Sequence, residues 1–222
     1  MASTSKKLAR EFYGPSMFEV TLGAALSLLL GGFLAAGYLV AQPVETVRSM
    51  PREPDPEKVY YVTGSARSSL GKQWLRKKQM LTESGAAEIR LSEDELNTWM
   101  SSSKSKPDAE ETAGIFSAKS INFRVQEGTL QVGVPCDLSL PFFKKSVVVQ
   151  ARGQFVERGG RFEYSPDEVM IGQLAAHRLP LLGSLVMGAV TSTYETPEDL
   201  SAAWDTLNEV SVDGKALLLV RR

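Results

Sequence analysis

The sequence predicts an α+β protein in which an N-terminal transmembrane helix is followed by an antiparallel β-meander packed on an apolar helix. Three patterns lead to this fold class. Residues 20–41 carry no charged side chain. Residues 130–140 alternate strictly between apolar side chains and others, which is the period of a half-buried strand. An apolar stripe with helical spacing then runs from Leu181 to Val190.

The composition is that of a folded domain, with 43% hydrophobic and 23% charged residues among 222. The net charge of -1 argues against a nucleic-acid partner, because phosphate contacts need a surplus of Lys and Arg. The single cysteine, Cys136, excludes an internal disulfide framework and CxxC-type metal sites. We therefore expect no nucleic acid, no metal and no cofactor.

The uncharged stretch 20–41 is long enough to cross a bilayer. As a helix rising 1.5 Å per residue it would measure about 33 Å, against a hydrocarbon core of about 30 Å. A cleaved signal peptide is the main alternative, but its apolar part is normally about 7–15 residues. Leu39 and Ala41 also make a poor cleavage site. We predict an uncleaved anchor whose lipid partner is the bilayer itself.

Orientation and domain limits follow from the flanks of this helix. The basic residues are balanced, with Lys6, Lys7 and Arg10 before it and Arg48, Arg52 and Lys58 after it. The short N-terminal tail favours an N-terminus inside. The prediction is a cytoplasmic tail (1–19), a transmembrane helix (20–41), a Pro-rich stalk (42–64) and an extracytoplasmic α+β domain (65–222). The expected location is a bacterial inner membrane with the main domain in the periplasm.

The first part of the domain combines helices with one strand. A helix is expected over 68–83 and a short strand over 87–91. Ser92 and Glu95 form a capping box that starts the next helix. Because the cap and the helix dipole account for the acidic residues there, they are not interpreted as a metal or catalytic site. Residues 101–112 are polar and predict an exposed loop.

The second part predicts consecutive strands joined by Gly-containing turns, which is typical of a meander. We expect strands at 121–125, 129–140, 146–157 and around Phe162, and a further short run at 168–174. Pro135 in the second strand implies an edge strand or a bulge. Two short strands at 209–212 and 215–220, turned at Asp213 and Gly214, are expected to rejoin the sheet.

An apolar helix is expected to cover this sheet. No charged residue occurs from Leu179 to Thr193, so the helix should be buried on two sides or line a groove. A second short helix is expected to begin at Thr196, with Pro197 in its first turn.

Sequence motifs of catalysis are absent: we find no GxGxxG, P-loop, HExxH, GxSxG or SxxK pattern. Cys136 and the lone histidine, His177, are the one conceivable nucleophile–base pair. Cys136, however, falls on the apolar side of its strand, where an inert thiol is the usual case. We predict no catalytic residue and a protein that is not an enzyme.

The order of elements resembles a known family. The relevant segments are residues 91–97 (Leu-Ser-Glu-Asp-Glu-Leu-Asn), 132–140, 169–174 and the apolar stretch opening at Leu179. They are similar to YpmS-like bacterial membrane-anchored proteins and, more distantly, to the tubular lipid-binding superfamily. The resemblance covers residues 86–222 and implies a curved sheet wrapped on an apolar helix, a design able to hold an acyl chain. It implies no catalytic residue.

Two functions remain open. The first is binding of a lipid or another apolar ligand between the sheet and the helix at 179–193, where missing glycine side chains would leave room. Its predicted ligand-binding residues are Leu182, Gly183, Leu185, Val186, Gly188 and Ala189. The alternative is a structural or accessory subunit of a cell-envelope membrane complex, with an envelope protein as partner.

Overall fold

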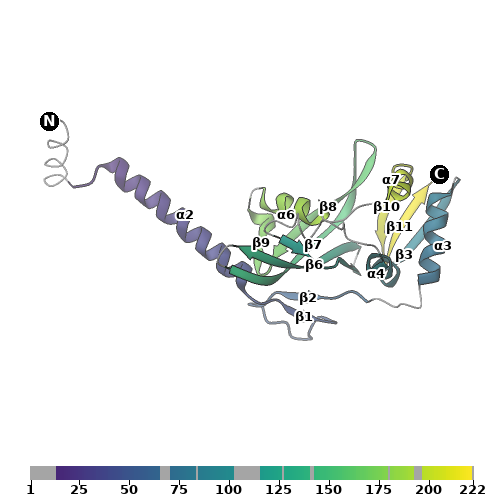
Figure 1. Cartoon of the computed structure of the whole chain (residues 1–222), viewed down its shortest axis with the longest axis horizontal. Coiled ribbons are helices and arrows are strands. Elements are labelled where there is room, and N and C mark those ends of the chain that lie inside the picture. Colours follow the sequence, from purple (N-terminus) through teal and green to yellow (C-terminus); the bar gives the residue numbers. More distant parts are fainter. Residues whose placement is uncertain are drawn as a thin grey trace. The chain divides into compact units, whose positions relative to one another are not determined.

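The computed structural model describes residues 14–65, 71–83, 85–102, 116–126, 128–140, 143–179, 181–192 and 197–221 (Figure 1). The chain divides into two compact units, Met1–Val40 and Ala41–Arg222. The predicted loop at 101–112, the predicted helix start at 68–70 and the predicted cap Thr196 fall largely or wholly outside the described residues.

The N-terminal helix α2 comprises Met17–Ala41 and has no buried residue. It begins three positions before the uncharged stretch because Ser16 and Glu19 cap it reciprocally. The Ser16 amide donates to the Glu19 carboxylate (3.1 Å) and the Glu19 amide donates to the Ser16 hydroxyl (3.2 Å). Among the described helices, α2 is the one whose length and hydropathy suffice to cross a membrane.

Residues 42–64, predicted as a stalk, are folded onto the second unit. Strands β1 (Glu45–Val47) and β2 (Tyr60–Val62) form a parallel pair. Tyr61 and Val62 are 3% and 5% exposed, which shows that the end of this segment packs on the domain. A Cβ atom at Gly133 would overlap the Tyr61 ring, so the glycine is what lets the ring lie on the sheet. The segment is therefore part of the domain and not a separate spacer.

The larger sheet confirms the predicted antiparallel meander. Its strands are β4 (Phe116–Ala118), β5 (Asn122–Gln126), β6 (Thr129–Leu140), β7 (Phe143–Arg158), β8 (Arg161–Ile171) and β9 (Leu174–Ala175). Their order is β4-β6-β7-β8-β9, with β5 also paired to β6. The alternation in β6 places Leu130, Val132, Val134, Cys136 and Leu138 in the core.

Two details of this sheet differ from the prediction. Strand β8 continues without a break to Ile171, because a register shift at Arg152 and Gly153 accommodates Pro166 opposite Gly153. Strand β6 is an interior strand, so the predicted alternative of an edge strand at Pro135 is wrong, whereas the ladder is irregular there as in a bulge: residues 119–121 lie opposite Val134 and Pro135. Pro135 lies where β5 has ended and β4 has not begun, and only its carbonyl is used there, accepting from the Lys119 amide (2.9 Å).

The C-terminal hairpin does not rejoin the meander, and that prediction is wrong. Strands β10 (Glu209–Asp213) and β11 (Ala216–Arg221) form a separate antiparallel sheet in the order β10-β11-β3, with β3 spanning Ala87–Ser92. The reason is apolar pairing, since Leu217 and Leu219 of β11 lie opposite Leu91 and Ile89 of β3, and all four are buried.

Helices gather at both ends of the second unit. Helices α3 (Gly71–Thr82), α4 (Glu93–Ser102) and α7 (Glu198–Trp204) lie beside the smaller sheet, whereas α6 (Leu182–Ser192) and the 3-10 turn η2 (Ala176–Arg178) lie at the β9 end of the larger one (Figure 1). Trp74 of α3 stacks on Trp99 of α4 with ring centroids 4.9 Å apart.

Helix α6 covers the sheet with one side only. Val186 and Val190 are buried, but Leu181 and Leu185 are 76% and 68% exposed. Of the two predicted arrangements, burial on two sides is therefore wrong, and lining of a groove stays a prediction. The apolar stripe was wider than the side that the sheet can cover.

Candidate functional site

The predicted ligand-binding residues on α6 do not share one interior surface. Val186 is buried and Leu182 and Gly183 are half-buried, whereas Leu185, Gly188 and Ala189 are exposed. A Cβ atom at Gly183 would meet Val169 and His177 at 3.7 Å, which is ordinary contact, so the helix lies close to β8 there. At Gly188 a Cβ atom would meet open space. Ligand binding by these six residues stays a prediction.

The outer side of this region forms an exposed apolar surface. It consists of Leu179, Leu181 and Leu185, and we call it the α6 surface. Leu181 has φ +65°, the one positive value at a non-glycine position in the described part of the chain. Left-handed backbone at leucine costs about 1–2 kcal/mol. The backbone is thus strained at a leucine whose side chain is exposed to solvent.

A pocket of about 1010 Å³ opens where the end of β2, the start of α4 and strand β5 meet. We call it the polar pocket. Its basic lining residues are Arg48, Arg124 and Lys215, and its acidic ones are Glu93 and Asp94. The three basic residues come from distant parts of the chain, so no local motif could have announced the site.

The wall of the polar pocket is built by the first residue of α4. The Glu93 carboxylate accepts hydrogen bonds from the amide and hydroxyl of Ser65 (2.6 and 3.3 Å) and from the Val125 amide (3.1 Å). A carboxylate that accepts several backbone hydrogen bonds is held in place. Glu93 therefore acts as a clamp between β5 and the chain that follows β2.

Asn97, one turn further along α4, completes this clamp. Its side-chain amide donates to the carbonyl oxygens of Ser65 (2.9 Å) and Phe123 (2.7 Å), and its oxygen accepts from the Phe123 amide (2.6 Å). Asn97 is only 4% exposed. The segment 91–97 is thus a structural connection between α4 and two other chain segments, with Leu91 and Leu96 buried beneath it.

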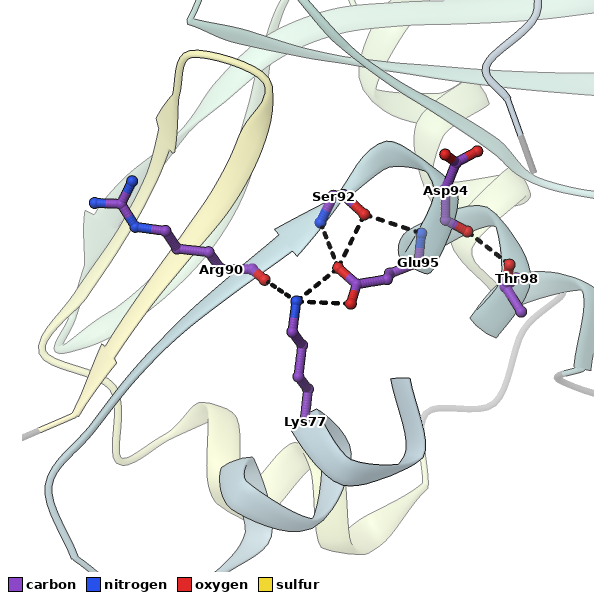
Figure 2. Close-up of polar contacts among 6 residues, drawn as sticks. All are labelled: Lys77, Arg90, Ser92, Asp94, Glu95 and Thr98. Atoms are coloured by element: carbon purple, nitrogen blue, oxygen red, sulfur yellow. Dashed lines mark hydrogen bonds and ion pairs between the residues drawn. The ribbon is translucent and has the colours of Figure 1, made fainter. Parts of the chain in front are cut away.

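Figure 2 shows the neighbouring cluster around Glu95, which is 2% exposed. Its carboxylate lies 2.6 Å from the Lys77 ammonium and accepts hydrogen bonds from the amide (2.8 Å) and hydroxyl (2.9 Å) of Ser92. Lys77 also donates to the Arg90 carbonyl oxygen (2.6 Å), so it joins α3 to β3 and α4. The predicted capping box is confirmed, and the ion pair is an addition that the sequence did not indicate.

The charge on Glu95 follows from these contacts. Burial alone would raise the pKa of Glu95, but the hydrogen bonds from Lys77 and Ser92 and the Lys77 charge together lower it. An ionised carboxylate held by an ion pair and by hydrogen bonds is a structural group, and a general acid would instead need a raised pKa. The cluster joins elements and offers no free proton donor.

A second, smaller pocket of about 390 Å³ lies between the chain around Met50–Tyr60 and the sheet. Gln131 and Gln150, each 8% exposed, line its floor, and the Gln131 amide donates to the Gln150 oxygen (3.1 Å). The Gln150 amide nitrogen has no hydrogen-bond partner within the described residues. The outer face of the meander thus carries a polar patch under the β1–β2 segment.

The conceivable nucleophile–base pair is placed in two different environments. Cys136 is 0% exposed, its thiol donates to the Val134 carbonyl oxygen (3.4 Å), and burial raises its pKa to about 12. His177 is exposed, and its Nδ1 atom lies 3.1 Å from the Val169 carbonyl oxygen. A buried, protonated thiol is not a nucleophile.

No cluster of three His, Cys, Asp or Glu side chains suited to a metal occurs within the part of the chain that the structure describes. Comparison of the chain with family models, curated proteins and solved structures gives no match. The resemblance to YpmS-like proteins and to the tubular lipid-binding superfamily thus stays a prediction from the sequence.

Proposed function

We propose that this chain is a single-pass, membrane-anchored accessory protein of the bacterial cell envelope that works by binding a partner. In this proposal α2 crosses the inner membrane with the N-terminus inside, and Ala41–Arg222 lies in the periplasm. The length and hydropathy of α2 support the anchor.

Binding is favoured over catalysis because the acidic and thiol groups considered above are already engaged. Glu93 is held by two backbone amides, and Glu95 is paired with Lys77. The Cys136 thiol is buried with a raised pKa. These groups stabilise the fold where they stand, and a proton or acyl transfer would require them to be free.

The polar pocket is the observation that carries the proposal of a protein partner. Arg48, Arg124 and Lys215 supply three positive charges around it against two negative ones from Glu93 and Asp94, and the Glu93 carboxylate is already held by backbone hydrogen bonds. A groove of this size with a small surplus of positive charge matches an extended segment of another envelope protein that carries acidic side chains, since complementary charge speeds and orients association. Because its basic residues come from three separate segments, the pocket exists only in the folded domain.

Site-specific photo-crosslinking in intact membranes tests the proposal. A photoreactive residue in place of Gln126, which lines the pocket, is expected to give a discrete adduct with one protein. The matched control replaces Glu157, which is exposed at the β7–β8 hairpin, and should give none. Arg124→Glu should abolish the Gln126 adduct. Equal adducts from positions 126 and 157, or only uncrosslinked monomer from both, would refute the proposed protein partner.

The second candidate function is binding of a lipid or another apolar ligand between the sheet and α6. It is favoured by the uncharged sequence of α6 and by its exposed leucines. Close contact at Gly183 and the burial of Val186 and Val190 leave less room than the sequence suggested. Native mass spectrometry of the protein released from mild detergent distinguishes lipid binding from binding of a protein partner. A stoichiometric bound lipid would favour lipid binding, and the mass of the unliganded chain would favour the protein partner.

A further inference from the structure

The point at which the second unit is joined to α2 is fixed by a hydrogen bond. Helix α2 ends at Ala41, and two positions later the Pro43 carbonyl oxygen accepts from the Gln173 side-chain amide (3.2 Å). Two residues of extended chain span at most about 7 Å. Gln173 lies in the turn between β8 and β9. The folded domain is therefore attached close to this turn and not through a long spacer.

The α6 surface follows this turn directly in the chain. β9, η2 and α6 occupy residues 174–192, and Figure 1 shows them together at one end of the larger sheet, away from α7. Leu179, Leu181 and Leu185 are 41%, 76% and 68% exposed. Exposed leucines without any charged neighbour on the helix are costly in water, and the left-handed backbone at Leu181 adds to that cost.

Basic side chains border the same end. Arg178 precedes Leu179 and is exposed. Lys144 and Lys145, at the start of β7, are also exposed. Both lysines pair with the end of β6. The same end of β6 pairs on its other side with β4, and β4 contacts α6. Apolar side chains bordered by Lys and Arg are typical of surfaces that lie in the interface of an anionic bilayer.

We propose that this end of the domain docks on the membrane that α2 anchors. Leu181 and Leu185 enter the head-group region, and Arg178, Lys144 and Lys145 contact anionic lipid head groups. The short connection to α2 supplies a high local concentration of bilayer, so weak contacts suffice. Docking would hold the polar pocket at a set height above the membrane. This inference rests on the proposed membrane anchor but not on the proposed protein partner.

Lipid-mediated quenching in the full-length chain tests the docking. Single cysteines Leu185→Cys, Ala202→Cys on α7 and Leu28→Cys on α2 are labelled with an environment-sensitive fluorophore, since the native thiol of Cys136 is buried. The protein is reconstituted alone into vesicles of phosphatidylcholine and phosphatidylglycerol that contain nitroxide lipids. Because only labels within the bilayer or at its interface meet the nitroxide, quenching at position 185 should exceed that at 202 by about threefold or more.

The three positions separate the possible failures. Quenching at 28 with equal, weak signals at 185 and 202 would overturn docking and leave the anchor intact. No quenching at 28 would overturn the anchor, and docking with it. Because the vesicles hold no other protein, a signal at 185 cannot come from a protein partner.

Charge reversal tests the basic border. The double variant Lys144→Glu and Lys145→Glu lies outside α6 and should reduce quenching at position 185 about threefold or more, since each lysine near an anionic surface contributes about 1 kcal/mol. Vesicles of phosphatidylcholine alone should reduce it similarly. Quenching that is unchanged by both would overturn the role of these lysines.

Discussion

Replacing Asn97 by alanine should loosen the junction between α4, β5 and the chain after β2. The substitution removes two hydrogen bonds donated to the carbonyl oxygens of Ser65 and Phe123 and one accepted from the Phe123 amide. Alanine at this position is compatible with the helix, so the backbone of α4 itself should not suffer. The loss falls on the three backbone groups that are left without a partner and on the Asn122 side-chain amide, which also donates to the Asn97 oxygen (3.3 Å).

The expected magnitude follows from burial. Asn97 is 4% exposed, so water can reach the abandoned groups only in part. An unsatisfied buried polar group costs about 1–3 kcal/mol, and we expect a total loss of about 3–5 kcal/mol because the Ser65 carbonyl borders the open pocket. Since a domain is stable by only about 5–15 kcal/mol, this is a large fraction.

Urea unfolding of the full-length protein in detergent measures the effect. Tryptophan fluorescence reports on Ala41–Arg222 alone, because all three tryptophans lie in that unit. With an m-value of about 2 kcal/mol per M, Asn97→Ala should lower the midpoint by about 2 M. Glu157→Ala, at an exposed site, should change stability by less than about 0.5 kcal/mol. A loss below about 1 kcal/mol for Asn97→Ala would refute the assigned clamp.

Three further outcomes are expected. The lowered pKa of Glu95 means that its charged form stabilises the fold, and this stability is lost as the pH falls through that pKa. Lys77→Met should cost about 2–4 kcal/mol of unfolding free energy at neutral pH. Unfolding of this variant at a series of pH values should show weaker acid destabilisation than unfolding of the native protein. Gly133→Ala should cost about 1–3 kcal/mol by displacing Tyr61, and in a double-mutant cycle this cost should shrink in a Tyr61→Ala background; an unchanged cost would contradict the contact. Cys136, whose thiol pKa is raised to about 12, should resist alkylation at mildly alkaline pH until urea unfolds the domain, and rapid native labelling would contradict its burial.

Local periodicity predicted the elements well because it depends on neighbours along the chain. The alternation at 130–140 places five side chains in the core, and Asp213 with Gly214 turns β10 into β11. The capping box at Ser92 and Glu95 is likewise a local pattern and forms as expected. The resulting α+β class, with an apolar N-terminal helix and antiparallel sheets, could be predicted from sequence.

Contacts between distant segments could not be read in the same way. Pairing of β11 with β3 depends on the fit of two apolar faces more than a hundred positions apart. The prolines of 42–64 indicate an extended spacer, and only the contact of Tyr61 with Gly133 reveals that the segment covers the sheet. The uncharged helix at 179–193 was expected to be buried on two sides or to line a groove, yet Leu185 on its outer side is 68% exposed.

The polar pocket escaped prediction for the same reason, since Arg48, Arg124 and Lys215 meet only in the folded chain. One signal was present. Asn97 is a polar residue between Leu96 and the apolar residues that follow, on the side of α4 that packs inward. A polar side chain at such a position indicates a buried hydrogen-bonded junction, and the pocket lies beside that junction.

The most direct test of the account is the topology of the chain in intact cells. Two cysteine variants, Ser3→Cys in the tail and Ala202→Cys on α7, are exposed to a membrane-impermeant maleimide in spheroplasts. The account predicts labelling at position 202 without lysis and at position 3 only after permeabilisation. Labelling of both without lysis, or of position 202 only after lysis, would contradict a periplasmic domain held by α2.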